Sequence, residues 1–397
     1  MRPIIRYFRL LFCVILLLFA DKQLSAQALN FKQYTVNDGL LSSTVYFTYQ
    51  DSKGFSWFAT AAGVNRFDGT TFESFTVDDG LSDNEVLWIQ EDSQQRIWFL
   101  TLNGKLSFFY KNKFYNGSNY PLLKKASTQA SFVSFFEDSQ GRIWLCSNQQ
   151  EVVMIGKNTV RFYRADSRYF LANSFATEDK KGAIWILNQK NIFKVLPDRL
   201  VRSRSQLFPV SHKSSIIDKA NRKTLFLSKN GLVEFDQGRS KLIRDVPEEI
   251  SEKGLGHFIM DADRSLWLST MGSGIYRFEN DSIVKNYLPG KIITHTITDK
   301  DGNLWMSTIG DAVFKLSANA KEAMHFDRST GMDDIAAHSI VKDERDRLWV
   351  GLRSGSINLI RGSEVTSGWV TDRRVYDPVR SLALDSASNS VWFASNN

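Results

Sequence analysis

Residues 137–147 read EDSQGRIWLCS, and close copies of this stretch recur along the chain. Each copy has an Asp, a short segment and a large aromatic residue in the same order. The six intervals between Trp57 and Trp305 average about 41 residues, which matches the ~40–45 residues of a four-stranded propeller blade. The aromatic position of the nine copies is held by Trp57, Trp98, Trp144, Trp185, Phe226, Trp267, Trp305, Trp349 and Trp392. We therefore expect one blade for each copy.

The residues of each copy are suited to a blade. The Asp can accept hydrogen bonds from the backbone N–H groups that follow it, and glycines such as Gly54 and Gly141 supply the positive φ of a tight turn. The aromatic residue then begins a strand such as IWLCS or LWLST, and a later turn leads into GVNRF or GIYRF. The many aromatic residues, 29 Phe, 10 Trp and 12 Tyr, also favour strands. We predict an all-β chain in which each repeated aromatic residue anchors its blade against a neighbour.

A second motif precedes some of the repeats and marks the start of a ring. Residues 34–43 read YTVNDGLLSS, residues 75–83 read FTVDDGLSD, and MHFDRSTGMDD occupies 324–334. Seven repeats lie between the first of these segments and the last. The return of the motif after the seventh repeat indicates that a second ring begins there.

These observations define three predicted parts of the chain. Residues 29–322 are predicted to form a seven-bladed β-propeller of four-stranded blades. The stretch FKQYT at 31–35 is expected to supply the outer strand of the seventh blade, because a closed ring leaves no open sheet edge. Residues 323–397 hold two further repeats and are predicted to be the first two blades of a truncated second propeller.

The first 28 residues have the pattern of a secretory signal peptide. Arg2, Arg6 and Arg9 precede the apolar run LLFCVILLLFA, and small residues follow in LSAQA, with cleavage expected near Ala26 or Ala28. The alternative is a membrane anchor, but the 11 residues of this run fall short of the ~20 that span a bilayer. We therefore expect a periplasmic or otherwise extracytoplasmic protein.

Export also changes the charge and the cysteine content. Removing residues 1–26 takes away four basic residues and one acidic residue, which lowers the formal net charge from +7 to +4. The remaining Lys and Arg are scattered, so nothing favours nucleic-acid binding. Cys13 is lost with the signal peptide, and Cys146 is then the single cysteine. It is expected to be buried on the face of its strand that also carries Trp144.

Candidate ligand-binding residues lie four positions before each turn Asp, on one face of the innermost strands. The seven positions hold Phe47, Trp88, Ser134, Phe175, Ser214, His257 and His295. Aromatic and imidazole rings beside polar groups suit sugars, which present apolar C–H faces surrounded by hydroxyls. We therefore predict ligand binding by the ring-bearing members of this set, while the alternative is that these side chains only fill the space between blades.

The stretch DSKGFSWFATAAGVNRFDG at 51–69, the DGL segments and the number of repeats resemble the two-component regulator propellers. These are periplasmic input domains of bacterial sensor histidine kinases and hybrid regulators. The resemblance implies sensing of an oligosaccharide or another small molecule. It also implies a histidine kinase or output module, in the intact protein or encoded by an adjacent gene, and allows a homodimer. Such proteins carry a second complete propeller, an immunoglobulin-like domain, a membrane helix and a kinase, so this chain is expected to be a fragment or one part of a split gene.

The sequence contains little that would indicate an enzyme. No HExxH, CxxC, GxSxG or phosphate-binding glycine loop is present, so we predict no metal, no cofactor and no catalysis. The segments DKDG at 299–302 and DADR at 261–264 lack the later ligands of an EF-hand and are expected to be turns. One rival is a lyase, because the repeats also resemble those of streptogramin lyase, with His257 and His295 as its imidazoles. A secreted protein-binding scaffold is the third class.

Overall fold

The structure is a computed structural model. It describes residues 31–395 except 167, 170, 189, 204–209, 219–222, 262–263, 280–281, 319–325, 363, 369–376 and 389, and it describes the strand at 210–218 by its backbone only. The predicted signal peptide therefore lies outside the described residues. The chain divides into a compact unit at Phe31–Ala318 and a second unit that includes the residues from Asn319 onward. Among the described helices, none is long and apolar enough to cross a membrane.

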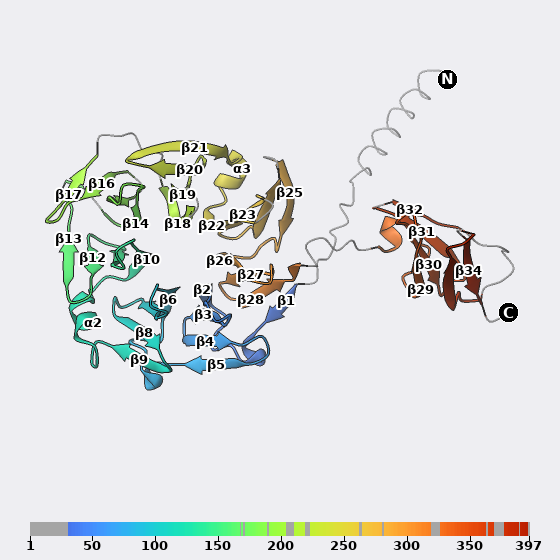
Figure 1. The fold of residues 1–397 in the computed structure, drawn as a ribbon, viewed down its shortest axis with the longest axis horizontal. Coiled ribbons are helices and arrows are strands. Elements are labelled where there is room, and N and C mark those ends of the chain that lie inside the picture. The colour runs from blue at the N-terminus through green and yellow to red at the C-terminus, as the bar shows by residue number, and fades with distance from the viewer. Residues whose placement is uncertain are drawn as a thin grey trace, which may run out of the picture. The chain divides into compact units, whose positions relative to one another are not determined.

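The described part of Phe31–Ala318 contains seven four-stranded antiparallel sheets, as expected for an all-β propeller. We number them blades 1 to 7 in chain order, and Figure 1 shows them around a ring with the first strand of each blade nearest the centre. Blades 1 to 4 contain β2 (Val45–Gln50), β3 (Ser56–Thr60), β4 (Gly63–Phe67), β5 (Phe72–Phe75), β6 (Val86–Glu91), β7 (Ile97–Thr101), β8 (Leu106–Tyr110), β9 (Lys113–Asn116), β10 (Phe132–Glu137), β11 (Ile143–Ser147), β12 (Val152–Ile155), β13 (Val160–Tyr163), β14 (Phe175–Glu178), β15 (Ile184–Leu187), β16 (Ile192–Val195) and β17 (Leu200–Arg202). Blades 5 to 7 contain β18 (Val210–Asp218), β19 (Lys223–Ser228), β20 (Gly231–Asp236), β21 (Arg239–Asp245), β22 (Leu255–Met260), β23 (Leu266–Thr270), β24 (Ile275–Glu279), β25 (Ser282–Tyr287), β26 (Ile293–Thr298), β27 (Leu304–Thr308) and β28 (Val313–Leu316).

The fourth strand of blade 7 comes from the start of the chain. Strand β1 (Lys32–Tyr34) pairs antiparallel with β28, and Tyr34 lies opposite Val313. The ring of Tyr34 stacks on Trp305, with 5.5 Å between centroids and 18° between planes. This pairing confirms that FKQYT supplies the outer strand of the seventh blade.

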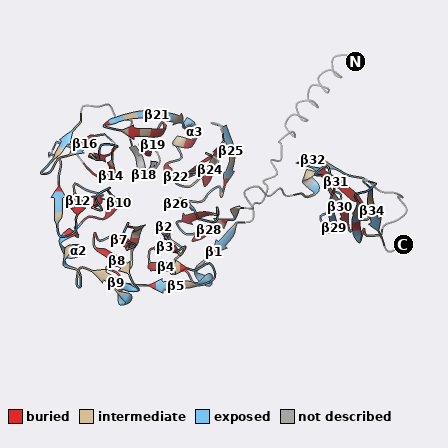
Figure 2. Ribbon diagram, in the orientation of Figure 1, coloured by how far each residue is buried: buried red, intermediate tan, exposed pale blue. Residues whose placement is uncertain are grey.

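Burial follows the position of each strand within its blade. Figure 2 shows buried residues on the inner and middle strands and exposed residues on the outer ones. The repeated aromatic residues of blades 1 to 7 are all buried, from Phe226 at 0% exposed to Trp185 at 9%. Cys146 is fully buried in the same hydrophobic cluster as Trp144, as predicted. Burial raises the pKa of its thiol to about 11.

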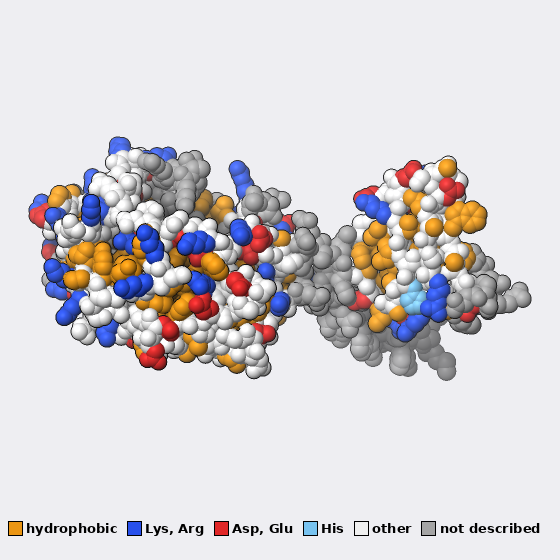
Figure 3. All heavy atoms as spheres, turned by 60° about the horizontal axis from the view of Figure 1, so that its bottom comes forward, with side chains coloured by type: hydrophobic (Ala, Val, Ile, Leu, Met, Phe, Trp, Pro, Cys, Tyr) orange, Lys and Arg blue, Asp and Glu red, His pale blue; other side chains and the backbone are white. Residues whose placement is uncertain are grey.

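Charged side chains do not gather into one patch on the visible face of the ring. Figure 3 shows Lys and Arg interspersed with Asp and Glu on the larger unit, with exposed hydrophobic side chains between them. This distribution matches the scattered charges of the sequence.

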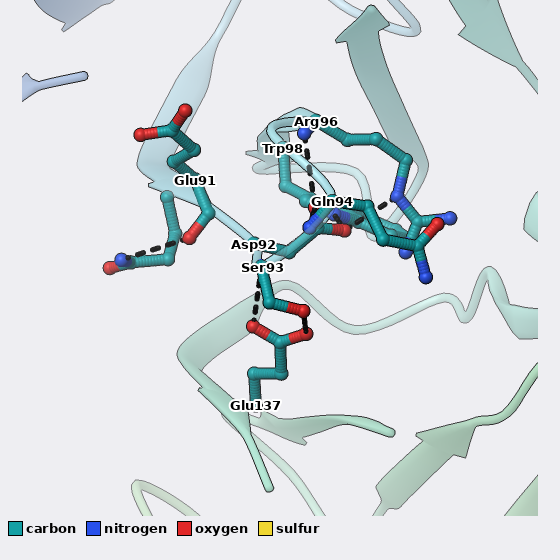
Figure 4. Close-up of polar contacts among 8 residues, drawn as sticks. Glu91, Asp92, Ser93, Gln94, Arg96, Trp98 and Glu137 are labelled. Carbon is teal, nitrogen blue, oxygen red and sulfur yellow. Dashed lines mark hydrogen bonds and ion pairs between the residues drawn. The ribbon is translucent and has the colours of Figure 1, made fainter. Parts of the chain in front are cut away.

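In six blades of the ring, the turn Asp is hydrogen-bonded to the repeated Trp. In blade 2, Asp92 Oδ1 accepts hydrogen bonds from the backbone N–H groups of Gln94 and Arg96, both at 3.0 Å. Its Oδ2 accepts one from Trp98 Nε1 at 2.7 Å (Figure 4). Blades 1, 3, 4, 6 and 7 have the same indole-to-carboxylate bond at 2.7–2.8 Å. The carboxylate thus satisfies turn donors and a buried indole at once, which explains why Asp and Trp recur as a pair.

Neighbouring blades are joined beside these turns by a contact that we call the carboxylate clasp. Glu137 of blade 3 accepts hydrogen bonds from the backbone N–H and the hydroxyl of Ser93 in blade 2, at 2.7 and 2.5 Å (Figure 4). The pairs Ser52–Glu91 and Ser139–Glu178 repeat it between blades 1 and 2 and between blades 3 and 4. The residues before the turn Asp in blades 5 and 6 are Ile217 and Met260, which have no carboxylate to form the clasp.

The second sequence motif forms short 3-10 helices ahead of the first two blades, η1 (Val36–Asp38) and η2 (Val77–Asp79). In each, a Thr and an Asp form a capping box, and the glycine that follows has a positive φ. The next residue, Leu40 or Leu81, is buried. The motif therefore forms a capped turn that places a buried leucine just before the first strand of the blade. A similar turn, η3 (Arg328–Thr330), follows residue 325.

Among the described residues, two short α-helices lie in the connections between successive blades. Helix α2 (Pro121–Ala126) follows β9, with Leu123 and Ala126 buried, and α3 (Glu248–Ser251) follows β21. The insertion of α2 accounts for the longer interval between Trp98 and Trp144.

The second unit, described by itself, contains a four-stranded sheet and a two-stranded sheet. The strands are β29 (Ala337–Lys342), β30 (Leu348–Leu352), β31 (Ile357–Arg361), β32 (Glu364–Thr366), β33 (Ser381–Asp385) and β34 (Ser390–Ala394). Trp349 donates to Asp343 Oδ2 at 2.9 Å, so the repeat keeps its local geometry here. Trp392, however, is 66% exposed.

Candidate functional site

Four of the five predicted ligand-binding side chains form one continuous row of rings in contact, which we call the ring stack although only the Phe47–His295 pair is close to parallel. His257 of β22 lies 4.1 Å from His295 of β26, measured between ring centroids. His295 lies 3.6 Å from Phe47 of β2, and Phe47 lies 4.4 Å from Trp88 of β6. The stack thus runs across blades 6, 7, 1 and 2 and includes the junction between the first and last blades.

The fifth predicted residue, Phe175, lies elsewhere. It is 2% exposed and packs against Phe226 at 5.8 Å, in the hydrophobic cluster between blades 4 and 5. Ser134 is buried and its hydroxyl lies next to the thiol of Cys146. The side chain of Ser214 lies outside the described residues. The structure therefore brings together the predicted rings of blades 6, 7, 1 and 2 and leaves Phe175 in a packing position.

β-Bulges at the start of the inner strands aim these side chains. The register between first and second strands shifts between Val45 and Phe47, and again between Ile293 and His295. Blades 2, 3 and 6 show the same kind of shift. A bulge bends the strand and redirects the side chains beside it. The paired part of β14 begins at Phe175 without such a shift, so this phenylalanine keeps the regular alternation and points between blades.

The bulges line a cavity of about 250 Å³. Met271, in the turn between β23 and β24, also borders it. The lining residues at the bulges are Tyr46, Phe47, Leu87, Trp88, Phe132, Val133, Gly256, His257, Thr294 and His295. None of the lining residues carries a carboxylate, an ammonium or a guanidinium group. The cavity is therefore an apolar, ring-lined recess at the inner strands of five blades.

The two histidines of the stack are neutral near pH 7. Burial lowers the pKa of His257 to about 3. Burial, and then the neighbouring His257, lower the pKa of His295 well below its usual value. Among the described residues, His257 Nδ1, His295 Nδ1 and Trp88 Nε1 have no hydrogen-bond partner. Buried polar atoms without partners are uncommon and cost stability. Three such atoms in one ring stack beside a cavity therefore make this cavity the candidate ligand-binding site.

Polar contacts fix the rim of the cavity. Thr294 Oγ1 donates to the backbone oxygen of Val45 at 2.7 Å, which links blade 7 to blade 1. Tyr46 donates its hydroxyl hydrogen to Glu85 at 2.8 Å, which links blade 1 to blade 2. Burial, together with this bond, raises the pKa of Tyr46 to about 12. The rim residues are thus held by their neighbours across two blade junctions.

Comparison with known proteins agrees with the predicted resemblance. Residues 80–103, which include β6 and β7, match the family model described as the two-component regulator propeller. No curated protein matches the chain in sequence. Residues 80–103 therefore match a repeat of the two-component regulator propellers, the family that the sequence resembles.

Solved structures with the same fold include extracellular domains of signalling proteins. One, from a B. thetaiotaomicron protein described as a hybrid two-component system, has a TM-score of 0.64 and 17% identity over 92% of this chain and 52% of its own. Another from that organism, described as a one-component system, has a TM-score of 0.55 and 14% identity over 92% and 51%. A catalytically inactive virginiamycin B lyase from Staphylococcus aureus, with quinupristin, has a TM-score of 0.54 and 17% identity over 72% and 98%. The chain spans about half the length of the two extracellular domains.

Proposed function

We propose that this chain is the ligand-sensing part of an extracytoplasmic input domain of a two-component system. Its ligand is a small neutral molecule, or the end of an oligosaccharide, bound in the ring-lined cavity. The observation that carries this proposal is the four-ring stack of His257, His295, Phe47 and Trp88, which holds three unpartnered polar atoms beside an uncharged cavity.

The chemistry of the cavity supports a neutral ligand with apolar faces. Aromatic rings can pack against the C–H faces of a sugar, and a small number of polar atoms can orient it. A charged ligand would enter a recess whose lining residues have no formal charge, and it would lose hydration without gaining an ion pair. At about 250 Å³ the cavity suits one ring-sized group rather than a long chain.

The position of the stack suggests how binding is passed on. The stack joins blades 6 and 7 to blades 1 and 2, so a ligand that contacts all four rings stabilises the junction where the chain closes on itself. A more rigid ring would then favour one arrangement of the parts attached to it. The expected recipient is a histidine kinase or an output module, with a homodimer as one possible signalling assembly.

Calorimetry with neutral oligosaccharides tests this function. A panel of xylo-, arabino-, manno- and malto-oligosaccharides is titrated into the protein and into its Trp88→Ala variant. Loss of a stacking Trp is expected to weaken binding at least about tenfold, or ~1.4 kcal/mol. Trp392→Ala, at an exposed tryptophan of the second unit that lines neither cavity nor groove, serves as the control. Unchanged affinity in a folded Trp88→Ala variant would show that the four rings only pack.

A lyase is the second candidate, because His257 and His295 lie in contact within a fold that a lyase also uses. General acid–base catalysis works best when the pKa of the group is near the operating pH, whereas both imidazoles have lowered pKa values. We therefore place sensing first. Incubation with quinupristin, followed by mass spectrometry, separates the two functions. We expect intact quinupristin, and cleavage that is lost in His295→Ala would establish the lyase instead.

A further inference from the structure

A second hollow lies over blades 2 and 3, away from the central cavity. Its volume is about 830 Å³. It is bordered by the turn between β7 and β8, the end of α2, residues 127–130, the turn between β11 and β12, and the end of β13. The turn between second and third strands also borders the central cavity, through Met271, so both hollows open on the same face of the ring. We call the larger one the blade 2–3 groove.

The segments that border this groove are held in place by hydrogen bonds and buried contacts. The backbone N–H of Thr128 donates to the Gly104 oxygen at 3.1 Å. Gly104 has a φ of +75°, and a Cβ atom there would lie 2.5 Å from the Ala130 oxygen, so the close approach of the two segments requires glycine. The buried residues Leu123 and Ala126 hold α2 against the hydrophobic cluster of blades 2 and 3. The groove therefore exists before any ligand arrives.

The charge of the groove is positive. Lys105, Lys124 and Arg164 line it together with one carboxylate, that of Glu151, which gives a formal net charge of +2. Arg164 pairs with Glu151 at 2.5 Å, and its side chain is 69% exposed. Among the described residues, neither Lys105 nor Lys124 has an ion-pair partner. The ammonium groups of these two lysines are therefore available to bind an anion.

Neutral polar groups and one exposed ring complete the lining. Gln149, Gln150 and Gln129 contribute amides, which can both donate and accept hydrogen bonds. Gln150 accepts from the Leu171 backbone N–H at 3.1 Å, and its orientation is fixed by that bond. The ring of Phe162 is 45% exposed at the edge of the groove. Amides next to an exposed aromatic face match the hydroxyls and C–H faces of a sugar.

We propose that the blade 2–3 groove binds an acidic oligosaccharide, one that carries carboxylate or sulfate groups. The free lysines bind the anionic groups, the glutamine amides bind hydroxyls, and Phe162 stacks on one sugar ring. This site is distinct from the central cavity, whose lining is uncharged. Residues 129–133 separate the two, because Gln129 and Ala130 line the groove whereas Phe132 and Val133 line the cavity.

Adjacent lysines of α2 provide a matched test. Lys124 lines the groove, while Lys125 is exposed but outside it. The full chain and its Lys124→Gln, Lys125→Gln, Phe162→Ala and Trp88→Ala variants are titrated with a galacturonate hexasaccharide, a heparin-derived hexasaccharide and neutral maltohexaose. Binding of either anionic probe is expected, and the comparison of the two identifies carboxylate or sulfate as the preferred group.

The variants decide whether the groove is the site. Lys124→Gln is expected to weaken binding of the anionic probe about tenfold, as for the loss of one charge-assisted contact. Phe162→Ala is expected to weaken it several-fold, while Lys125→Gln and Trp88→Ala leave it unchanged. Equal losses in Lys124→Gln and Lys125→Gln would overturn the proposal. So would binding of maltohexaose to the Trp88→Ala variant that is as tight as binding of the anionic probes. So would the absence of binding by both anionic probes.

Discussion

Trp305 in blade 7 and Trp392 in the second unit occupy the same place in the same repeat, yet their surroundings differ completely. Trp305 is 2% exposed and stacks on Tyr34, whereas Trp392 is 66% exposed. Trp349, whose sheet packs against β33 and β34, is half-buried. The turn and its indole-to-carboxylate bond therefore come from the repeat itself, and burial of the ring comes from the neighbouring sheet. Local sequence specifies a blade, but only adjacent blades stabilise it.

The largest effect is expected from Trp305→Ala, with Trp392→Ala as its control. Trp305→Ala removes a fully buried ring and should lower the free energy of unfolding of the Phe31–Ala318 unit by about 3–5 kcal/mol. Trp392→Ala removes a ring that is already exposed and should change stability by less than about 0.5 kcal/mol. Urea denaturation followed by circular dichroism measures both. Similar losses would mean that the repeated Trp stabilises its own blade without help from a neighbour.

Ring closure can be tested at Tyr34. Its side chain is 5% exposed and lies against Trp305 and Phe67, so Tyr34→Ala should cost about 2–4 kcal/mol. Gln33→Ala is the control on the same strand, because Gln33 is exposed and its side chain donates a hydrogen bond to the Asp311 oxygen at 2.9 Å. Hydrogen exchange at β28 should accelerate in the first variant and stay slow in the second. Slow exchange in both would show that β1 is not needed for closure.

Acid should weaken the closed ring through its buried histidines. The folded pKa of His257 lies below the unfolded value of ~6.5, so unfolded chains bind more protons in this range and stability falls as the pH drops below 6.5. Between pH 7.5 and 5.5 one such histidine contributes a loss of ~1.4 kcal/mol. His257→Gln should reduce this pH dependence. The matched variant His338→Gln, at an exposed site of the second unit, should leave it unchanged, and a reduction in both would place the effect outside the ring stack.

The smallest effect is expected at the carboxylate clasp. Glu137→Gln replaces two charge-assisted hydrogen bonds from Ser93 by weaker ones and should cost about 1 kcal/mol. Glu73→Gln, at an exposed pair with Arg66, should cost less. In the second unit the residues before the turn Asp are Lys342 and Leu384, which, like Ile217 and Met260 of blades 5 and 6, have no carboxylate to form the clasp. Equal costs in the two variants would reduce the clasp to an ordinary surface contact.

The sequence predicted much of the fold, because the repeat is local. The turn Asp, its glycine and the strand that follows lie within a dozen residues, and the spacing of the copies indicated blades. The closing role of FKQYT was inferred from the requirement that a closed ring leave no open sheet edge. The bond between Asp92 and Trp98 was missed, although the constant interval of six positions could have indicated it. The clasp was missed too, despite recurring triplets such as EDS at 91–93 and 137–139.

The candidate site was harder to predict, because it depends on strand register. Counting back from the turn Asp found His257, His295, Phe47 and Trp88, but it assumed that all inner strands begin alike. The bulges beside these rings are shifts in the pairing between two strands, which the sequence of one strand does not reveal. Phe175, on a strand without a bulge, was therefore assigned the same role while the structure packs it against Phe226. The blade 2–3 groove depends on α2, which the sequence showed only as a long interval.

The pairing of β1 with β28 also has a consequence for the timing of folding. Tyr34 and its partner Val313 are separated by about 280 residues, so at ~5–20 residues per second β1 leaves the ribosome on the order of 15–60 s before β28. During that time β1 is an unpaired strand that could join the edge of another chain. It is only three residues long, and two of them, Lys32 and Gln33, are polar and exposed in the finished ring. A short, polar first strand offers little apolar edge for such pairing, and Tyr34 is the one residue of β1 that becomes buried when the last blade is made.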